Sequence, residues 1–218
     1  MTMYPKEELN KVVRGSKRAT YDKDKINGIL DAGFIGFVSY VHEGIAISIP
    51  MAYSRIGDKI YLHGSLKNRM LRALLEVDQM SMTVMHLDAL VLARSGLHHS
   101  VNYRSATLFG SLQEIENRDR KVEILESIIN YMVPDRWDSL RPISEKEINS
   151  TLVIEMTIEN ASAKIRDVGV QDEKEDYETE VWAGLVPITQ VVGQPMRDEL
   201  LPDHVDTPEH ILNYVSRG

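Results

Sequence analysis

Residues 97–105 carry an unusual density of side chains that can form hydrogen bonds. The run contains the imidazoles of His98 and His99, the amide of Asn102, the phenol of Tyr103 and the guanidinium of Arg104. The β-type run 106–110 follows directly. So many polar groups at the start of a strand are costly to bury without partners. The segment is therefore typical of a site that holds a polar, planar or anionic ligand.

The alternation of a strand divides this segment into two faces. His98, Ser100, Asn102 and Arg104 share one face, which is wholly polar. We expect that face to border a ligand or its solvent mouth. The other face carries His99, Val101, Tyr103 and Ser105, and we expect it to lean toward the packed interior.

A second candidate site is the run 61–69, which predicts a strand, a glycine turn and the start of a helix. Gly64 lets the backbone approach a ligand closely, and the helix start offers free N–H groups that favour phosphate. Ser65, Asn68 and Arg69 add side-chain donors, and a guanidinium matches a phosphate in charge and shape. The alternative is an ordinary strand–helix turn with a surface arginine.

A metal site on His86, Asp88, His98 and His99 is a weaker reading. Adjacent residues of a strand point to opposite faces, and no HxH or HxxxH spacing places two imidazoles on one side. Rossmann and P-loop signatures are also missing, as is the nucleophile elbow of serine hydrolases.

Composition narrows the class of protein. The chain has 218 residues, 43% of them hydrophobic, and no cysteine, which rules out disulfides and thiolate chemistry. A net charge of −8 argues against nucleic-acid binding. No apolar stretch is long enough for a membrane span, and the first residues lack a signal peptide, so we expect a cytoplasmic protein.

Hydrophobic periodicity predicts most of the elements. Helices are expected at 22–31, capped by Asp22 or Asp24, at 67–76, from Asn117 to before Pro134, and after the capping-box pair Ser144 and Glu147. Pro50 marks an edge or bulge. Strands are expected at 34–41, 45–49, 59–63, 80–92 with a break or bend at 88–89, 103–115, 152–158 and 161–166, and the last two are expected to pair together.

Six or seven strands with helices inserted irregularly do not form a doubly wound parallel sheet. They fit an antiparallel barrel decorated by helices, so the fold class is mainly β with helices (α+β). We expect one barrel domain with an N-terminal helical arm at 1–168. The remainder, 169–218, is expected to be a C-terminal extension that packs on the barrel or on a dimer partner.

The order of these pieces resembles the FMN-binding split-barrel family, which includes pyridoxamine 5′-phosphate oxidase and the nitroimidazole-resistance proteins. The resemblance covers roughly 14–187 and rests on the segments 63–69, 92–95, 98–105, 162–166 and 181–184. The pieces 102–105 and 182–184 look like an uncharacterised branch of that family. The substrate-binding arginine and histidine of pyridoxamine oxidase are not recognisable near the C-terminus.

The resemblance implies an antiparallel split β-barrel with FMN bound at the interface of a homodimer. By this resemblance, Ser65, Asn68 and Arg69 are expected to bind the FMN phosphate, and the backbone at 49–52 and 61–64 is expected to line the isoalloxazine ring. The cofactor-binding residues expected in all are Ile49, Pro50, Met51, Ala52, Tyr61, Leu62, His63, Gly64, Ser65, Asn68, Arg69, His98, Ser100, Asn102, Arg104 and Trp182. The apolar alternation at Met80, Met82, Val84, Leu90 and Leu92 is expected to supply dimer surface.

The leading functional hypothesis is an FMN-dependent oxidoreductase that passes hydride from NADH or NADPH to a small-molecule acceptor through the flavin. His63, His98 or His99 is a candidate proton donor, and no residue is assigned as catalytic. A flavin-binding or sensing protein without turnover is the second hypothesis. A cupin-like metal enzyme is the third.

Overall fold

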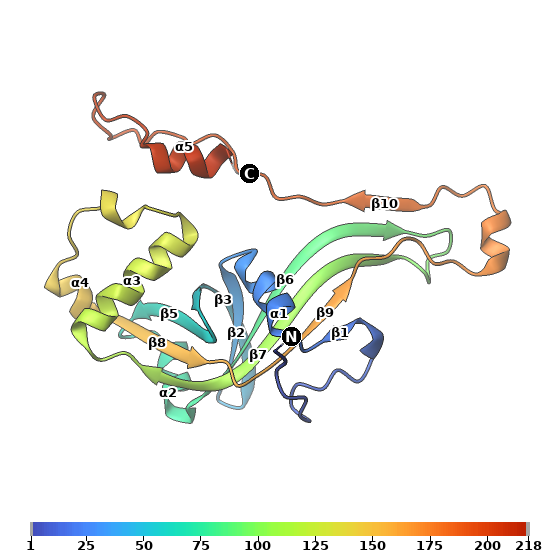
Figure 1. Ribbon diagram of the computed structural model, residues 1–218, viewed down its shortest axis with the longest axis horizontal. Coiled ribbons are helices and arrows are strands. Elements are labelled where there is room, and N and C mark those ends of the chain that lie inside the picture. Colours follow the sequence, from blue (N-terminus) through green and yellow to red (C-terminus); the bar gives the residue numbers. More distant parts are fainter. Residues whose placement is uncertain (1, 217–218) are drawn as a thin grey trace.

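The computed structural model describes residues 2–216, in which an antiparallel sheet curls into an open barrel and a long two-stranded arm projects from it (Figure 1). The main path of the sheet runs β3-β2-β6-β7-β8-β5-β4. The strands are β1 (Ala19–Thr20), β2 (Ile35–His42), β3 (Ile45–Ala52), β4 (Ser54–Ile56), β5 (Lys59–Ser65), β6 (Gln79–Leu92), β7 (Ser100–Glu114), β8 (Thr151–Thr157), β9 (Asn160–Arg166) and β10 (Gly184–Pro187).

Helices connect and cover these strands, and the first four lie where the sequence pattern predicts them. They are α1 (Lys23–Asp31), α2 (Arg69–Val77), α3 (Arg118–Met132), α4 (Glu145–Ser150) and α5 (Glu209–Ser216), with short 3₁₀ turns η1 (Ser16–Arg18), η2 (Trp137–Ser139) and η3 (Lys174–Glu178). Asp22 caps α1 by accepting the N–H groups of Asp24 and Lys25. Ser144 and Glu147 form the reciprocal capping box before α4.

The antiparallel hairpin of β6 and β7 is the longest feature of the chain. Its outer half leaves the barrel as the arm in Figure 1. The register slips between Leu87 and Ala89, which confirms the bend expected near Asp88. The sequence left open whether the strand breaks or bends here, and a single strand continues through the bulge because β7 pairs with it before and after Asp88.

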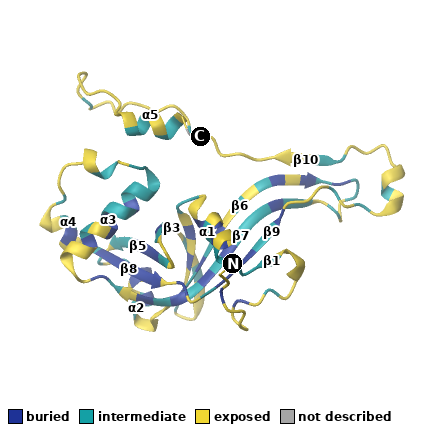
Figure 2. Cartoon of the chain, in the orientation of Figure 1, coloured by how far each residue is buried: buried dark blue, intermediate teal, exposed yellow. Residues whose placement is uncertain are grey.

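The main hydrophobic core fills the inside of the barrel (Figure 2). Met80, Met82 and Val84 are at most 3% exposed and belong to this core. The prediction that they offer dimer surface is therefore wrong, because their face of β6 points inward. The opposite face of the same strand carries Met85 and Leu87, which are exposed.

The sheet has a split where two strands keep free edges. β3 pairs only with β2, which confirms the edge position predicted from Pro50. β5 pairs with β4 only from Lys59 to Tyr61, so the residues 62–65 have β8 on one side and no strand on the other. Unpaired N–H and C=O groups at such edges are available to a ligand or a partner.

Two predictions about the C-terminal third differ from the structure. β9 pairs with β7 and β1 rather than with β8, because after β8 the chain continues along the same edge of β7, opposite β6, through an irregularity at 158–159. The weakly periodic tail contains α5, and β10 lies along the arm by pairing with β6. No helix within residues 2–216 is long and apolar enough to cross a membrane.

Gly110 is a position where the fold depends on the absence of a side chain. A Cβ atom there would lie 1.8 Å from the backbone oxygen of Thr157. We expect Gly110→Ala to lower the free energy of unfolding by about 3 kcal/mol or more, because backbone must move. Gly28→Ala is the matched control: it meets nothing within 4 Å in α1 and should raise stability by about 0.5–1 kcal/mol. Equal stability of the two variants in urea titrations would contradict this packing.

Candidate functional site

The turn between β5 and α2 is tightly built around Gly64 and Asn68. A Cβ atom on Gly64 would lie 3.0 Å from Leu71 Cδ1 and 3.2 Å from Asn68 Nδ2, so a side chain here would force one of these two to shift slightly. Asn68 caps α2, and its Oδ1 accepts the N–H of Leu71 at 3.1 Å. The sequence predicts Asn68 only as a hydrogen-bond donor to a phosphate. The structure gives its oxygen a capping role and leaves Nδ2 beside Gly64.

The start of α2 presents unused donors. The Asn68 N–H reaches the Ser65 carbonyl, whereas the N–H groups of Arg69 and Met70 have no partner within residues 2–216. The exposed Arg69 makes no ion pair in that range, and its Nη2 donates to the Tyr40 hydroxyl at 3.3 Å. A cation beside free N–H groups at a helix start favours an anionic ligand.

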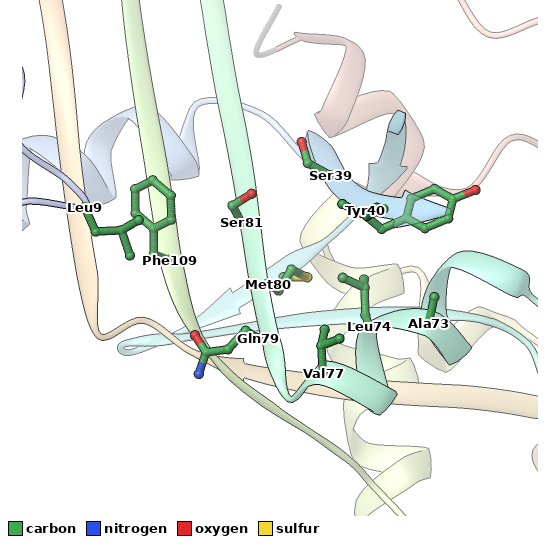
Figure 3. A pocket seen from close by; sticks show the side chains of 11 residues that line it. Leu9, Ser39, Tyr40, Ala73, Leu74, Val77, Gln79, Met80, Ser81 and Phe109 are labelled. Atoms are coloured by element: carbon green, nitrogen blue, oxygen red, sulfur yellow. The ribbon is translucent and has the colours of Figure 1, made fainter. Parts of the chain in front are cut away.

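An apolar cavity of about 390 Å³ lies at the C-terminal half of α2, between that helix, β2 and the start of β6 (Figure 3). Tyr40 is one of its lining residues, and the Tyr40 hydroxyl accepts the bond from Arg69 at the other end of α2. Tyr40 could not be found from the sequence, since only the pairing of β2 with distant strands brings it to α2. The lining residues are Leu9, Ser39, Tyr40, Val41, Ala73, Leu74, Val77, Gln79, Met80, Ser81 and Phe109.

The structure brings the predicted segments 49–52 and 61–64 together. β4 begins two residues after Ala52 and pairs Ser54 with Tyr61, so the end of β3 is tied to β5. The side chains of Tyr61 and Leu62 are fully buried, so these residues offer only their backbone. Ile49 and Met51 pack partly on the core, while Pro50 is exposed.

His63 stands out within this region. It is half-buried, and its Nδ1 is buried without a hydrogen-bond partner within residues 2–216. Burial lowers the pKa of the imidazole below its ordinary value. The ring is therefore mostly neutral at pH 7 and has a free nitrogen for a ligand, and less of the protonated form is present to donate a proton.

Two of the polar hairpin residues, Asn102 and Arg104, have hydrogen-bond partners within the chain. Asn102 is 3% exposed, accepts from Arg166 Nη1 at 2.5 Å, and binds the Val168 backbone through both ends of its amide. Arg104 pairs with Asp88 through two nitrogens, at 2.9 and 3.1 Å. Asn102 therefore does not lie at a solvent mouth within one chain, because satisfied hydrogen bonds allow its amide to be buried.

The remaining hairpin and tail residues lie on the arm. His98 Nε2 is 3.5 Å from Glu173, and the half-buried Ser100 pairs with Val91 in the β6–β7 register. Trp182 is 66% exposed and folds back against Gly184, beside the strand that pairs with β6. The structure of one chain does not bring these residues to the β5–α2 turn.

The four residues of the metal hypothesis also have separate partners. His86 Nε2 is 2.9 Å from the Ile29 carbonyl, and His99 Nδ1 is 2.9 Å from the Ser95 carbonyl. No group of three or more possible ligands gathers around one point in residues 2–216. The geometry gives the cupin-like hypothesis no support.

Comparison with known proteins places the fold. Residues 22–165 match the sequence profile of the pyridoxamine 5′-phosphate oxidase family. The chain belongs to this family. No curated protein matches the sequence. A 5-nitroimidazole antibiotic resistance protein from Bacteroides thetaiotaomicron is 21% identical over 67% of this chain and 86% of that one, with a TM-score of 0.59, which shows a shared fold.

Two solved structures match almost the whole chain. The flavocytochrome Anf3 from Azotobacter vinelandii is 35% identical, with a TM-score of 0.90, over 95% of this chain and 96% of that one. The FAD and heme binding protein from Mycobacterium smegmatis is 31% identical, with a TM-score of 0.85, over 90% and 96%. The match therefore includes the arm and much of the C-terminal extension.

A buried carboxylate fixes β5 beneath the candidate site. Glu155 on β8 accepts bonds from Lys59, from the Tyr61 hydroxyl at 2.9 Å and from Gln113 at 3.1 Å. Burial alone would raise the pKa of Glu155, but these bonds outweigh it and hold the pKa below the ordinary value.

The stabilisation from Glu155 should therefore be present above the pKa of the unfolded chain, about 4.3, and disappear as the pH falls through the lower folded value. We expect Glu155→Gln to cost about 1.5–3 kcal/mol at pH 7 and to flatten the loss of stability below pH ~5. Denaturant titrations across that range measure both effects. If the variant loses stability below pH ~5 as steeply as the parent does, Glu155 is not the cause of that loss.

Proposed function

We propose that this chain is a flavin-dependent oxidoreductase that holds the flavin phosphate at the turn between β5 and α2. The observation that carries the proposal is the near-complete match with a flavocytochrome and with a protein named for FAD and haem. Both matches exceed 30% identity and extend well beyond the barrel.

The residues present fit such a cofactor. Arg69 and the free N–H groups of α2 suit a phosphate, and Gly64 lets the backbone come close. The split between β3 and β5 offers unpaired backbone for a polar ring edge, and an apolar cavity lies at the far end of α2. A mostly apolar hollow with a few placed polar groups is typical of cofactor sites.

FAD is the flavin that we favour. The family resemblance by itself points to FMN, whereas the M. smegmatis relative is named for FAD and aligns with 90% of this chain. A dinucleotide needs more surface than a mononucleotide, and the arm and the extension supply surface beyond the barrel.

A bound flavin supplies hydride and electron transfer, and the chain supplies binding, orientation and polarity. NADH or NADPH is the donor class that we propose, with a small molecule as acceptor. His63, held neutral, would accept a hydrogen bond at the cofactor edge. A flavin-binding protein without turnover would share this geometry, and steady-state oxidation of NADH or NADPH separates the two.

Haem is a second candidate cofactor, because both near-full-length relatives are named as haem or flavocytochrome proteins. Neutral imidazole is a common haem ligand. Within residues 2–216, His63, His98 and His210 each have a buried imidazole nitrogen that makes no hydrogen bond. Of these three residues only His63 lies in the barrel. Haemin titration should give a shifted Soret band in the parent and not in His63→Ala. The same spectrum in both proteins would remove His63 from this role.

The phosphate assignment predicts a loss of flavin affinity on mutation of Arg69. Removing one charge-assisted bond costs about 1.5–3 kcal/mol, so Arg69→Ala should bind flavin roughly ten- to a hundredfold more weakly. Arg72→Ala is the control on the same helix, because its Nε already donates to the Leu66 carbonyl. Fluorescence quenching of FAD and FMN measures both. Equal affinity of Arg69→Ala and the parent would refute the assignment.

We propose in addition that two chains assemble as a homodimer through the outer face of β2 and β6. Ile35, Phe37, Met85 and Leu87 are exposed there, and Phe37 and Met85 are 45% and 52% exposed. Phe37 lies opposite Thr83, so alternate residues of the two strands form one surface. Contiguous apolar surface of this kind marks an interaction site.

Light scattering should therefore show a two-fold dimer for the parent. A charge at the centre of this face, in Phe37→Glu or Met85→Glu, should give monomers with weakened flavin binding. Leu97→Glu is the control, since Leu97 is 88% exposed at the tip of the arm. A parent monomer that carries a full complement of flavin would contradict the shared-site arrangement.

A further inference from the structure

Five cations gather where the N-terminal segment meets β9. Arg14, Lys17 and Arg18 lie in or beside η1, and Lys164 and Arg166 lie on the strand that pairs with β1. None of them forms an ion pair within residues 2–216, and the neighbouring carboxylate of Asp167 is exposed. Most other arginines of this acidic chain are matched with carboxylates.

The register of the strands brings these charges together. Ala19 lies opposite Lys164 in the β1–β9 ladder, so Arg18 is next to that position. The Lys164 ammonium approaches the turn at Gly15, where a Cβ atom would be 3.5 Å from Nζ. Ser105 and Tyr103 lie opposite Lys164 and Arg166 on β7, which adds hydroxyl groups to the same surface.

Arg166 is the buried member of the cluster. It is 4% exposed, and its Nε is buried without a partner within residues 2–216. Its other contacts are with oxygens, Asn102 Oδ1 at 2.5 Å and the Val168 carbonyl at 3.5 Å. Burial lowers the pKa of this guanidinium, and the nearby charge of Arg18 lowers it further.

Such an arrangement is unfavourable without a counter-charge. Like charges repel, and a buried donor without a partner carries a desolvation cost. Arginine and lysine donors that converge with hydroxyl groups match the oxygens of a phosphoryl group.

We propose that Arg18, Lys164 and Arg166 form a second anion site, which binds a phosphate or diphosphate group of the kind that a nucleotide carries. The site is separate from the β5–α2 turn. Figure 1 shows β1 apart from α2, and β9 pairs with β1 and β7, whereas β5 pairs with β8 and β4. It is independent of the proposed flavin phosphate contact at Arg69.

Calorimetric titration of pyrophosphate into the full chain tests the proposal, with acetate at the same ionic strength as the comparison anion. We expect saturable binding of pyrophosphate and no saturable binding of acetate. The double variant Arg18→Gln/Lys164→Gln should weaken it at least tenfold, because two charge-assisted contacts are lost. These two side chains are chosen because the buried Arg166 supports Asn102, so its replacement risks unfolding.

The double variant Lys146→Gln/Lys174→Gln is the matched control, since it removes the same charge from exposed positions on α4 and η3. It should bind pyrophosphate like the parent. Arg69→Ala should also retain this binding, while Arg18→Gln/Lys164→Gln retains flavin. The inference is overturned if pyrophosphate binding to the parent does not saturate. It is also overturned if both double variants lose pyrophosphate affinity equally, or if only Arg69→Ala loses it.

Discussion

Backbone pairing of β6 with β7 is the interaction on which the rest of the structure depends. β6 also pairs with β2 and β10, and β7 also pairs with β8 and β9, so the hairpin joins both halves of the sheet. β8 and β9 follow one edge of β7 in succession, and Gly110 has no side chain where the Thr157 backbone passes close to it between the two strands. The hairpin thus forms the barrel wall and, beyond the bulge, the arm that carries β10.

The same pairing explains where the barrel is open. β6 and β7 have partners on both edges, so the free edges of the barrel lie at strands farther along the path, which include β3 and the end of β5. The candidate site lies at these edges, because backbone groups there are not used by the sheet. Buried anchors hold the site from below: Tyr61 bonds to Glu155, and Leu62 packs in the core, so the turn at Gly64 has a fixed base.

The sequence predicted what depends on local pattern. The caps at Asp22, Asn117 and Ser144, the alternation of β2 and β3 and the bend at Asp88 are all present. Features set by distant residues were not predictable. The partner of β9, the bond between Tyr40 and Arg69, and the burial of Asn102 against Arg166 each join segments that are far apart in the chain. Of the polar residues at 98–104, Asn102 and Arg104 have intramolecular partners that the local pattern does not reveal.

The central claim is that the split beside α2 holds a flavin. Chromatographic identification of the cofactor released on denaturing the purified protein tests it most directly. The account predicts a stoichiometric flavin, with FAD favoured over FMN because of the near-full-length match with an FAD and haem protein. A folded protein that releases no flavin, and that retains neither FAD nor FMN through gel filtration after incubation with each, would contradict the account.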